Sequence, residues 1–546
     1  MTAVATRPQS FAPNGFAQLT GTRTLITLAA RRDRVILAIW LYALTALVAS
    51  TAYSFRHLYP TAQERAAFAA GINGNSSILA LYGPVYSHSL GGLTAWRIAV
   101  FGAAGAALMS IFTVIRHTRA DEEAGRLELV GSTVVGRQAP LAAALAVTFG
   151  ACLVLGLLIT AACAALGLPA TGSLALGAAL ALAGCLFGAV AAVSAQLTES
   201  ARGARGIAAS VLGLAFLLRA VGDSASGLSW LTWASPLGWA ERIRPFAGQR
   251  WWVAGLSVVG AAAFTGAAGV LATRRDLGAG LLPARPGPAR APGWLRSPFA
   301  LAWHLQRGSL LGWVIGFAVT GAVLGSAAKG IGSLVDTSPQ VRQAMVRLGG
   351  RAGLVNAYFG AILGLLGVIA AAYAVAATLR LRGEETGQRA DPVLAAPVGR
   401  LRWAAGHLVI AAIGTAALLA AAGLFAGLTY GQRSGDVGRQ LPRLLGAALV
   451  QVPAAWLVGA IALALFGLAP RLAVPAGWTA VGVVAFLTLF GPVLQFSHWV
   501  LDVSPFTHVP KLPGGAFTAA PLVWLTIVAA ALIAAGLVGF RRRDLG

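Results

Sequence analysis

Long apolar runs most constrain what this chain folds into. Each is around 20 residues long, the length that an α-helix needs to cross the hydrocarbon core of a bilayer. Of all residues, 57% are hydrophobic and only 11% are charged, whereas a soluble domain has about 25% charged residues. The sequence therefore predicts an all-α polytopic membrane protein with twelve transmembrane helices. The expected spans lie near residues 35–55, 98–115, 139–166, 173–197, 206–222, 252–273, 309–328, 357–379, 404–430, 444–468, 473–497 and 518–540.

A charged motif occurs twice, each time after the second apolar run of a half. The first copy, residues 116–137, reads RHTRADEEAGRLELVGSTVVGR, and the second, residues 380–400, reads RLRGEETGQRADPVLAAPVGR. A Ser-Pro pair also precedes the last run of each half, and Arg-Arg-Asp-Leu-Gly follows it, at 235–236 and 274–278, then at 504–505 and 542–546. Because the matches keep their order, the sequence predicts two parallel six-helix repeats.

A stretch rich in proline and arginine, residues 274–307, separates the two sets of runs and marks the boundary between the halves. The basic segment before the first run resembles an amphipathic helix that lies on a membrane surface. We therefore expect four parts: a cytoplasmic N-terminal segment with an interfacial amphipathic helix, a first six-helix half, a cytoplasmic linker and a second six-helix half, over residues 1–34, 35–275, 276–307 and 308–546.

The net charge of +24 comes from arginines between the apolar runs. In a membrane protein the positive-inside rule explains such a charge better than a nucleic-acid partner does. If both termini are cytoplasmic, most arginines of the first half fall on the inner side, and so do both copies of the charged motif. We expect a multi-pass protein of the cell membrane, with segments 56–97 and 329–356 outside, and with short interfacial or re-entrant helices within 223–250 and 498–517.

The sequence contains no residue pattern that indicates catalysis or ion coupling by this chain. Every Asp and Glu lies outside the expected spans, although ion-driven transporters need ionisable groups at membrane depth. His407 and His498 are the only candidates for such a group, and both lie near helix ends. A phosphate-binding GxxxxGK[ST] loop, a metal-ligand cluster and a nucleophile–base pair are all missing. We therefore expect no catalytic residue, no metal and no cofactor in this chain.

The doubled charged motif is where a partner protein would deliver energy. The acids at 121–123 suit the first turn of a short helix, where the helix dipole favours negative charge. Leu127 and Leu129 would give that helix an apolar side. The alternative is a solvated turn that only joins two helices. The candidate contact residues of both copies are Asp121, Glu122, Glu123, Gly125, Arg126, Glu128, Glu384, Glu385, Gly387 and Asp391.

These motifs resemble permeases of the ABC-2 type export family. In that family a charged loop with Glu-Glu-x-Gly and a later Gly-Arg, after the second span, carries the coupling helix that meets the ATPase. The segments LYGPVYSHSLGG at 81–92 and TVIRHTRADEEAGRLEL at 113–129 look like the actinobacterial tetronasin-type and multidrug efflux permeases, which are fused, double-length members. The second loop has Ala-Asp-Pro at 390–392 in place of Leu-Glu-Leu, so we expect the first loop to be the more sensitive one.

The resemblance implies a separate ATPase subunit, two copies per permease, with ATP and Mg bound on that subunit. It also implies export of bulky apolar compounds, such as antibiotics, along the second and fifth helices of each half. The candidate lining residues are Phe101, Phe112, Phe216, Phe359, Tyr373, Phe486 and Phe490. Aromatic side chains that only pack against helices or lipid are the alternative for these positions.

Two other classes of protein stay open from the sequence. An ion-coupled secondary multidrug transporter would also fit two parallel six-helix halves. A membrane-embedded enzyme that acts on lipids would need polar catalytic residues near one interface. Drugs, lipids and peptides all remain open as the cargo.

Overall fold

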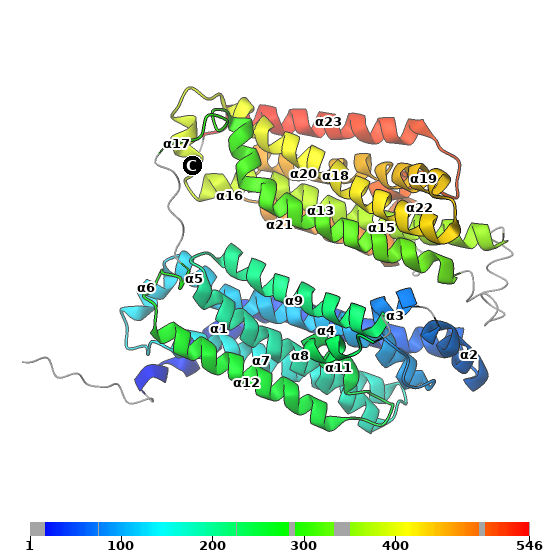
Figure 1. Ribbon diagram of the computed structural model, residues 1–546. Helices are drawn as coiled ribbons and strands as arrows, with labels where there is room; N and C mark the ends of the chain where they lie inside the picture. Colours follow the sequence, from blue (N-terminus) through cyan, green and yellow to red (C-terminus); the bar gives the residue numbers. More distant parts are fainter. Residues whose placement is uncertain are drawn as a thin grey trace, which may run out of the picture. The chain divides into compact units, whose positions relative to one another are not determined.

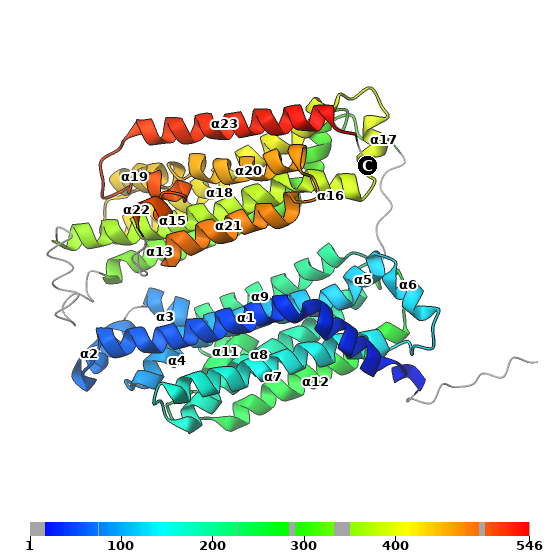
Figure 2. The same ribbon diagram turned by 180° about the vertical axis from the view of Figure 1, so that it is seen from behind.

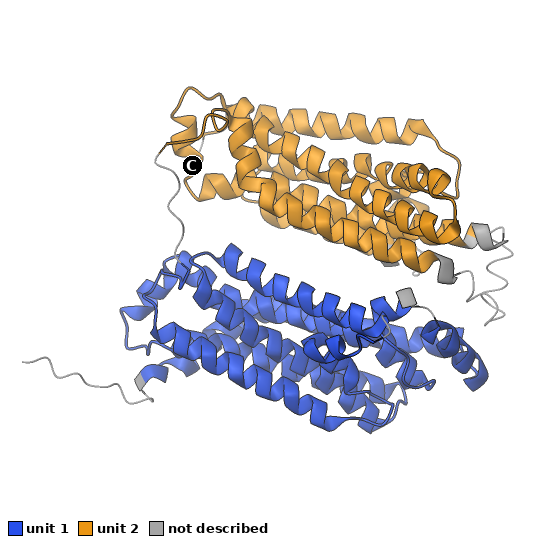
Figure 3. Cartoon of the chain, in the orientation of Figure 1, with its two compact units in different colours: residues 1–286 blue, residues 287–546 orange. Residues whose placement is uncertain are grey.

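The computed structural model describes residues 17–74, 76–224, 227–282, 290–331, 350–490 and 497–544, and these are mostly helical (Figure 1). The chain divides into two compact units, residues 1–286 and 287–546 (Figure 3). Their boundary falls inside the linker expected at 276–307. Each unit buries its own cluster of apolar side chains.

The first unit is built on six long helices, which match the six expected runs. Helix α8 packs against α4, α7 and α12, and α1 packs against α4 and α7. Figure 2 shows α1 running along the unit from the end with α5 and α6 to the end with α2. The bounds are α1 (Thr22–Leu58), α4 (Leu90–His117), α7 (Ala139–Ala165), α8 (Ala170–Leu197), α9 (Ala201–Ser224) and α12 (Trp251–Thr273).

Short helices occupy the connections of the first unit. Two lie in the charged loop, and we call the end of the unit that carries this loop the loop end. Two others follow α1 at the opposite end (Figure 1). Two more lie between α9 and α12, where the sequence predicted short helices. The bounds are α2 (Ala62–Asn73), α3 (Ser76–Tyr82), α5 (Arg119–Glu123), α6 (Arg126–Gly131), α10 (Trp230–Ala234) and α11 (Pro236–Arg242).

The second unit repeats the packing scheme of the first. Helix α20 packs against α15 and α23, as α8 packs against α4 and α12, and α13 packs against α18, as α1 packs against α7. The long helices are α13 (Pro298–Ile331), α15 (Gly350–Thr378), α18 (Arg400–Ser434), α19 (Val437–Leu449), α20 (Val452–Leu468), α21 (Ala473–Phe490) and α23 (Ala519–Arg542). The short ones are α16 (Arg380–Thr386), α17 (Asp391–Leu394) and α22 (His498–Leu501), with a 3-10 helix η3 (Pro505–His508).

Within the described residues, eleven helices are long and apolar enough to cross a membrane, with α19 and α20 together forming one of them. The apolar helix Ala473–Thr488 is shorter. It begins the eleventh expected span, 473–497, whose residues 491–496 lie outside the described part of the chain. The prediction of an all-α polytopic membrane protein is confirmed.

One expected boundary does not appear in the fold. The sequence placed an interfacial helix before residue 35, but α1 begins at Thr22 and continues without a break to Leu58. The basic residues of that segment therefore belong to the first turns of the first long helix. Helix propagation adds one hydrogen bond per residue, so a break needs a residue such as proline or glycine, and this stretch contains neither.

Close packing between helices of the second unit depends on glycine. A Cβ atom added at Gly467 of α20 would overlap the carbonyl oxygen of Gly536 in α23. The two backbones therefore touch directly at this point. Small residues of this kind allow membrane helices to approach closely, where van der Waals contact replaces the hydrophobic effect as the source of attraction.

Candidate functional site

The first charged loop folds into two one-turn helices. Helix α5 carries Asp121 and Glu122 in its first turn, as the helix dipole favours, and ends at Glu123. Gly125 then takes a left-handed backbone conformation, with φ of 70°, and α6 begins at the next residue. Glycine adopts this conformation without the steric penalty of a Cβ atom. The turn directs α6 away from α5.

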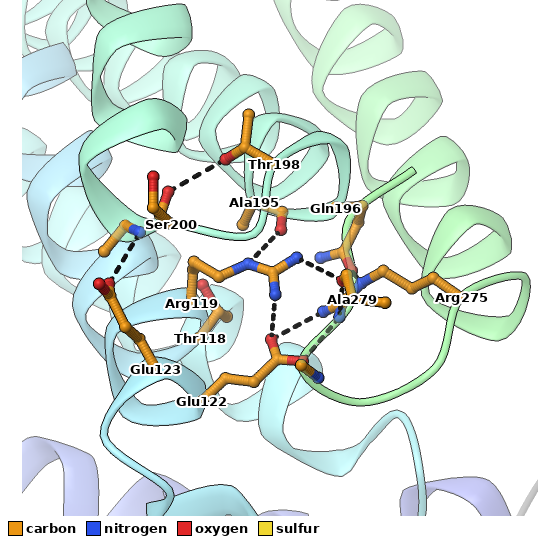
Figure 4. A network of polar contacts seen from close by, with 12 residues as sticks. Thr118, Arg119, Glu122, Glu123, Ala195, Gln196, Thr198, Ser200, Arg275 and Ala279 are labelled. Carbon is orange, nitrogen blue, oxygen red and sulfur yellow. Dashed lines mark hydrogen bonds and ion pairs between the residues drawn. The ribbon is translucent and has the colours of Figure 1, made fainter. Parts of the chain in front are cut away.

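Glu122 is buried and fully engaged inside its own unit. Its carboxylate accepts two hydrogen bonds from the guanidinium of Arg275, at 2.6 and 2.9 Å, and a third from the backbone N–H of Gly278 at 2.6 Å. Arg119 forms a further ion pair with it at 3.0 Å (Figure 4). A carboxylate with this many donors has no capacity left for a partner protein.

The neighbouring side chains tie α5 to the turn between α8 and α9. Arg119 donates from Nε to the carbonyl of Ala195 at 3.0 Å, and from a terminal nitrogen to the carbonyl of Ala279 at 3.0 Å. The Glu123 carboxylate accepts from the backbone N–H of Ala201, the first residue of α9, at 3.0 Å (Figure 4). The loop is thus fixed to three separate parts of the first unit.

Asp121 instead faces the first helix. It forms ion pairs with Arg32 of α1 and with Arg126 of α6, both at 2.8 Å. One helical turn away, the buried Asp33 of α1 is 2.7 Å from His117 at the end of α4. These contacts hold the basic start of α1 against the charged loop.

The second charged loop repeats the engagement of its acids. Glu384 forms ion pairs with Arg380 at 2.9 Å and with Arg389 at 2.8 Å. Glu385 pairs with Arg382 and with Arg543, both at 2.9 Å. The Glu384 and Glu385 side chains are both only 6% exposed, so these arginines surround buried carboxylates. Neither carboxylate faces solvent.

The charged motif and the Arg-Arg-Asp-Leu-Gly repeat meet at one place in each unit. In the first, the closing arginine of the loop, Arg137, donates to the backbone carbonyl of Arg275, whose side chain holds Glu122. In the second, Arg400 donates to the carbonyl of Arg543 at 2.8 Å, and the Arg543 side chain holds Glu385. We call these two groups the loop clamps: Glu122, Arg137 and Arg275, and Glu385, Arg400 and Arg543.

The exposed part of the first loop lies on α6 and just after it. Helix α6 buries no residue, Leu129 is 75% exposed and Val134 is 88% exposed. Among the candidate acids, Glu123, Glu128 and Asp391 are exposed, whereas Asp121, Glu122, Glu384 and Glu385 are buried. The arrangement separates an inner face that holds the loop in place from an outer face that is open to a partner.

The candidate lining aromatics have different surroundings. Phe101 of α4 and Phe216 of α9 meet with ring centroids 6.2 Å apart, and Tyr82 lies 5.2 Å from Phe101. The others are distributed as follows: Phe112 and Phe486 are exposed on their unit, Phe359 is buried beside Tyr430, Tyr373 is buried beside Trp313, and the Phe490 side chain lies outside the described residues. Phe101 and Phe216 are thus brought together.

A buried charge cluster at the end of the first unit opposite the loop was missed by sequence reasoning. Arg219 of α9 has no exposed side-chain surface and lies 3.4 Å from Asp223 and 3.7 Å from Glu241. It also donates to the backbone carbonyls of Ala80 and Leu81 in α3. An arginine inside an otherwise apolar run was the signal that could have revealed the cluster.

Glu241 of α11 is the unusual member of this cluster. Burial and, to a smaller extent, the negative charge of Asp223 raise the pKa of Glu241 to about 8, against the opposing effect of Arg219. The hydroxyl of Tyr86 donates to one carboxyl oxygen at 3.1 Å. Since the charged form costs most free energy when it is desolvated, the folded unit favours a protonated Glu241 near neutral pH.

This preference predicts a pH dependence of stability. The folded pKa lies above the ordinary value of 4.5, so the stabilisation is complete below about 4.5 and is lost as the pH rises through about 8. We expect the melting temperature in detergent to fall over that interval, and Glu241→Gln to remove this part of the fall. Melting curves of both proteins between pH 5 and 9 test it, with Glu64→Gln as the control. Parallel curves for wild type and Glu241→Gln would contradict it.

The described fold is that of a polytopic helical membrane protein made of two like units. A family model described as multidrug efflux system permease Rv1217c, C-terminal domain, matches residues 295–541. The chain is also 48% identical over 541 residues to the multidrug efflux system permease protein Rv1217c of Mycobacterium tuberculosis, which covers 98% of this chain and 97% of that relative.

The chain therefore belongs to the family of multidrug efflux system permeases. The resemblance that the charged motif and the segment at 81–92 indicated is confirmed. The family supports a transport subunit over an enzyme, and it favours neither a secondary transporter nor a lipid-modifying enzyme.

Proposed function

We propose that this chain is the membrane permease of an ATP-driven exporter whose ATPase is a separate subunit, present in two copies. ATP and Mg bind on that subunit, and both charged loops and both termini of this chain face the cytoplasm. The cargo is a class of bulky apolar compounds, for which the aromatic pair Phe101 and Phe216 offers contact area.

The observation that supports this proposal most is the two-sided build of the charged loop. Its buried acids form ion pairs with arginines of the same unit. Helix α6 buries none of its residues and exposes Glu128 and Leu129. A loop that only joined two helices would not need an ordered, apolar outer face. An apolar side chain ringed by charges is typical of a protein contact.

Vesicles that contain this chain with or without its co-expressed ATPase test the proposal. We expect accumulation of a fluorescent apolar drug in inside-out vesicles only when both subunits and ATP are present. Accumulation should continue when an ionophore collapses the proton gradient. The intact complex should have the mass of one permease chain and two ATPase chains. Transport by the permease alone, driven by a proton gradient, would overturn the proposal.

A further inference from the structure

We propose that Arg275 and Arg543 are positioning residues that make each charged loop move as one piece with the last helix of its unit. Arg543 directly follows α23, and Arg275 is the second residue after the end of α12. This inference rests on the proposed function, because it takes the ATPase as the source of the movement. It assigns to the loop clamps the task of passing that movement to the end of a long helix.

The two clamps form independently in the two units. Arg275 holds Glu122, which lies 153 residues earlier in the chain, and Arg543 holds Glu385, which lies 158 residues earlier. The paired acids come from different positions of the Glu-Glu motif, and the residues that follow the two motifs differ. The same three-part contact nevertheless forms in both units. Its recurrence indicates that the contact itself is what the repeated motifs share.

Each clamp arginine also reaches the fourth span-length helix of its unit, which is α8 in the first unit and α19 with α20 in the second. Arg275 donates from Nε to the side-chain oxygen of Gln196 in α8, at 2.7 Å. Arg543 lies over the ring of Phe466 in α20, 4.6 Å from its centroid, and over Phe540 of α23. Helices α8 and α20 are equivalent in the packing scheme. One side chain therefore joins the loop, the last helix and the fourth helix in each unit.

The acid and the last-helix arginine of each clamp lie away from the surface that a partner can reach. The side chains of Glu122 and Arg275 are 4% and 11% exposed, and those of Glu385 and Arg543 are 6% and 15% exposed. Separating either pair would leave a buried charge without its partner, which strongly disfavours that state. A displacement of the loop by the ATPase therefore carries the helix end along.

The guanidinium geometry explains why arginine is needed. Its planar fork binds both oxygens of Glu122 and still reaches the carbonyl of Ala279 and the side chain of Gln196. A lysine keeps the charge but presents a single ammonium group, so it cannot make the bidentate contact and the side contacts together. Arg→Lys substitution should loosen the connection without removing the charge.

The experiment compares Arg275→Lys/Arg543→Lys with the matched pair Arg274→Lys/Arg542→Lys, whose arginines are the exposed neighbours. For each permease, the amount in the membrane, ATPase co-purification, ATP hydrolysis and drug efflux are measured. We expect the clamp variant to keep assembly and hydrolysis while efflux falls about tenfold, within the usual range of coupling between sites. The control pair should keep all four.

A covalent connection provides a second measurement, which also decides the case if the lysine variant accumulates poorly. In a chain whose natural cysteines are replaced, Glu122→Cys/Arg275→Cys should export poorly, and a short bis-maleimide cross-link between the two positions should restore efflux. Unchanged efflux in the double lysine variant, or no recovery after cross-linking, overturns the inference. Loss of ATPase co-purification would instead place these arginines at the docking surface. Wild-type efflux without the ATPase would contradict the proposed function itself.

Discussion

Arg219→Met is expected to prevent the chain from accumulating as a folded permease. The arginine side chain is fully buried, and its loss leaves Asp223 and Glu241 without their central cation and the carbonyls of Ala80 and Leu81 without a donor. Breaking a buried charge pair by removing one partner typically costs about 3–5 kcal/mol. That is a large part of the about 5–15 kcal/mol by which most proteins are stable. Membrane fractions followed by fluorescence-detected size exclusion measure the loss.

Two further variants make this expectation specific. Arg97→Met removes an exposed arginine at the same end of the unit, which stacks on Tyr82 at 4.3 Å. Such a contact contributes about 0.5–1 kcal/mol at exposed sites, so this control should accumulate normally. Adding Asp223→Asn and Glu241→Gln to Arg219→Met replaces both acidic side chains, which have lost their cation, by neutral amides and should restore most of the folded protein. A monodisperse Arg219→Met single variant would show that the cluster does not stabilise the unit.

Leu129→Asp should abolish efflux and ATPase co-purification while the permease itself folds normally. Leu129 is the most exposed residue of the apolar side of α6, and none of the contacts that hold the loop involves it. An aspartate in the middle of a protein contact has less apolar contact area than leucine and places a carboxylate where it is desolvated. Substitutions at such central positions often cost at least about 2 kcal/mol of binding free energy. Co-purification of the tagged ATPase, at equal permease expression, measures the effect.

Leu129→Met is the matched control, because it keeps the apolar area and should keep assembly. Asp391→Arg changes the exposed acid of the second loop and should weaken assembly less, since α17 is a single short turn with a proline. Normal assembly of Leu129→Asp with the ATPase would indicate that the first loop is a solvated turn and not a partner contact. A folded but ATPase-free permease is the result that supports the contact.

The structure also changes how the acids of the loops should be tested. Reversing Glu385 would place a third guanidinium beside Arg382 and Arg543, and reversing Glu123 would remove the acceptor of the Ala201 N–H. Both changes would disturb the permease before they reported on a partner. Glu128 is the acid of the first loop that is exposed and free of these roles. Charge reversal at that position is therefore the cleaner test of an ATPase contact.

The amino-acid sequence by itself determined the membrane architecture. A run of about 20 apolar residues has few alternatives in a bilayer, because only a helix satisfies its backbone hydrogen bonds within the segment. The predicted run at 139–166 became α7, Ala139–Ala165, and the run at 252–273 became α12, Trp251–Thr273. The acids at 121–123 also predicted a short helix, because the dipole effect on a helix start is local. The family resemblance rested on equally local motifs.

Only the tertiary structure decided what the charged residues do. No local pattern indicates that Glu122 meets Arg275, 153 residues away, or that Glu385 and not Glu384 meets Arg543. In the sequence, Asp223 and Glu241 are only two of the acids that lie outside the expected spans, whereas folding gathers them around Arg219. The physical reason is that a buried charge is stable only beside a partner, and the identity of that partner depends on how whole helices pack. Helix packing is set by many weak contacts that no single stretch of sequence contains.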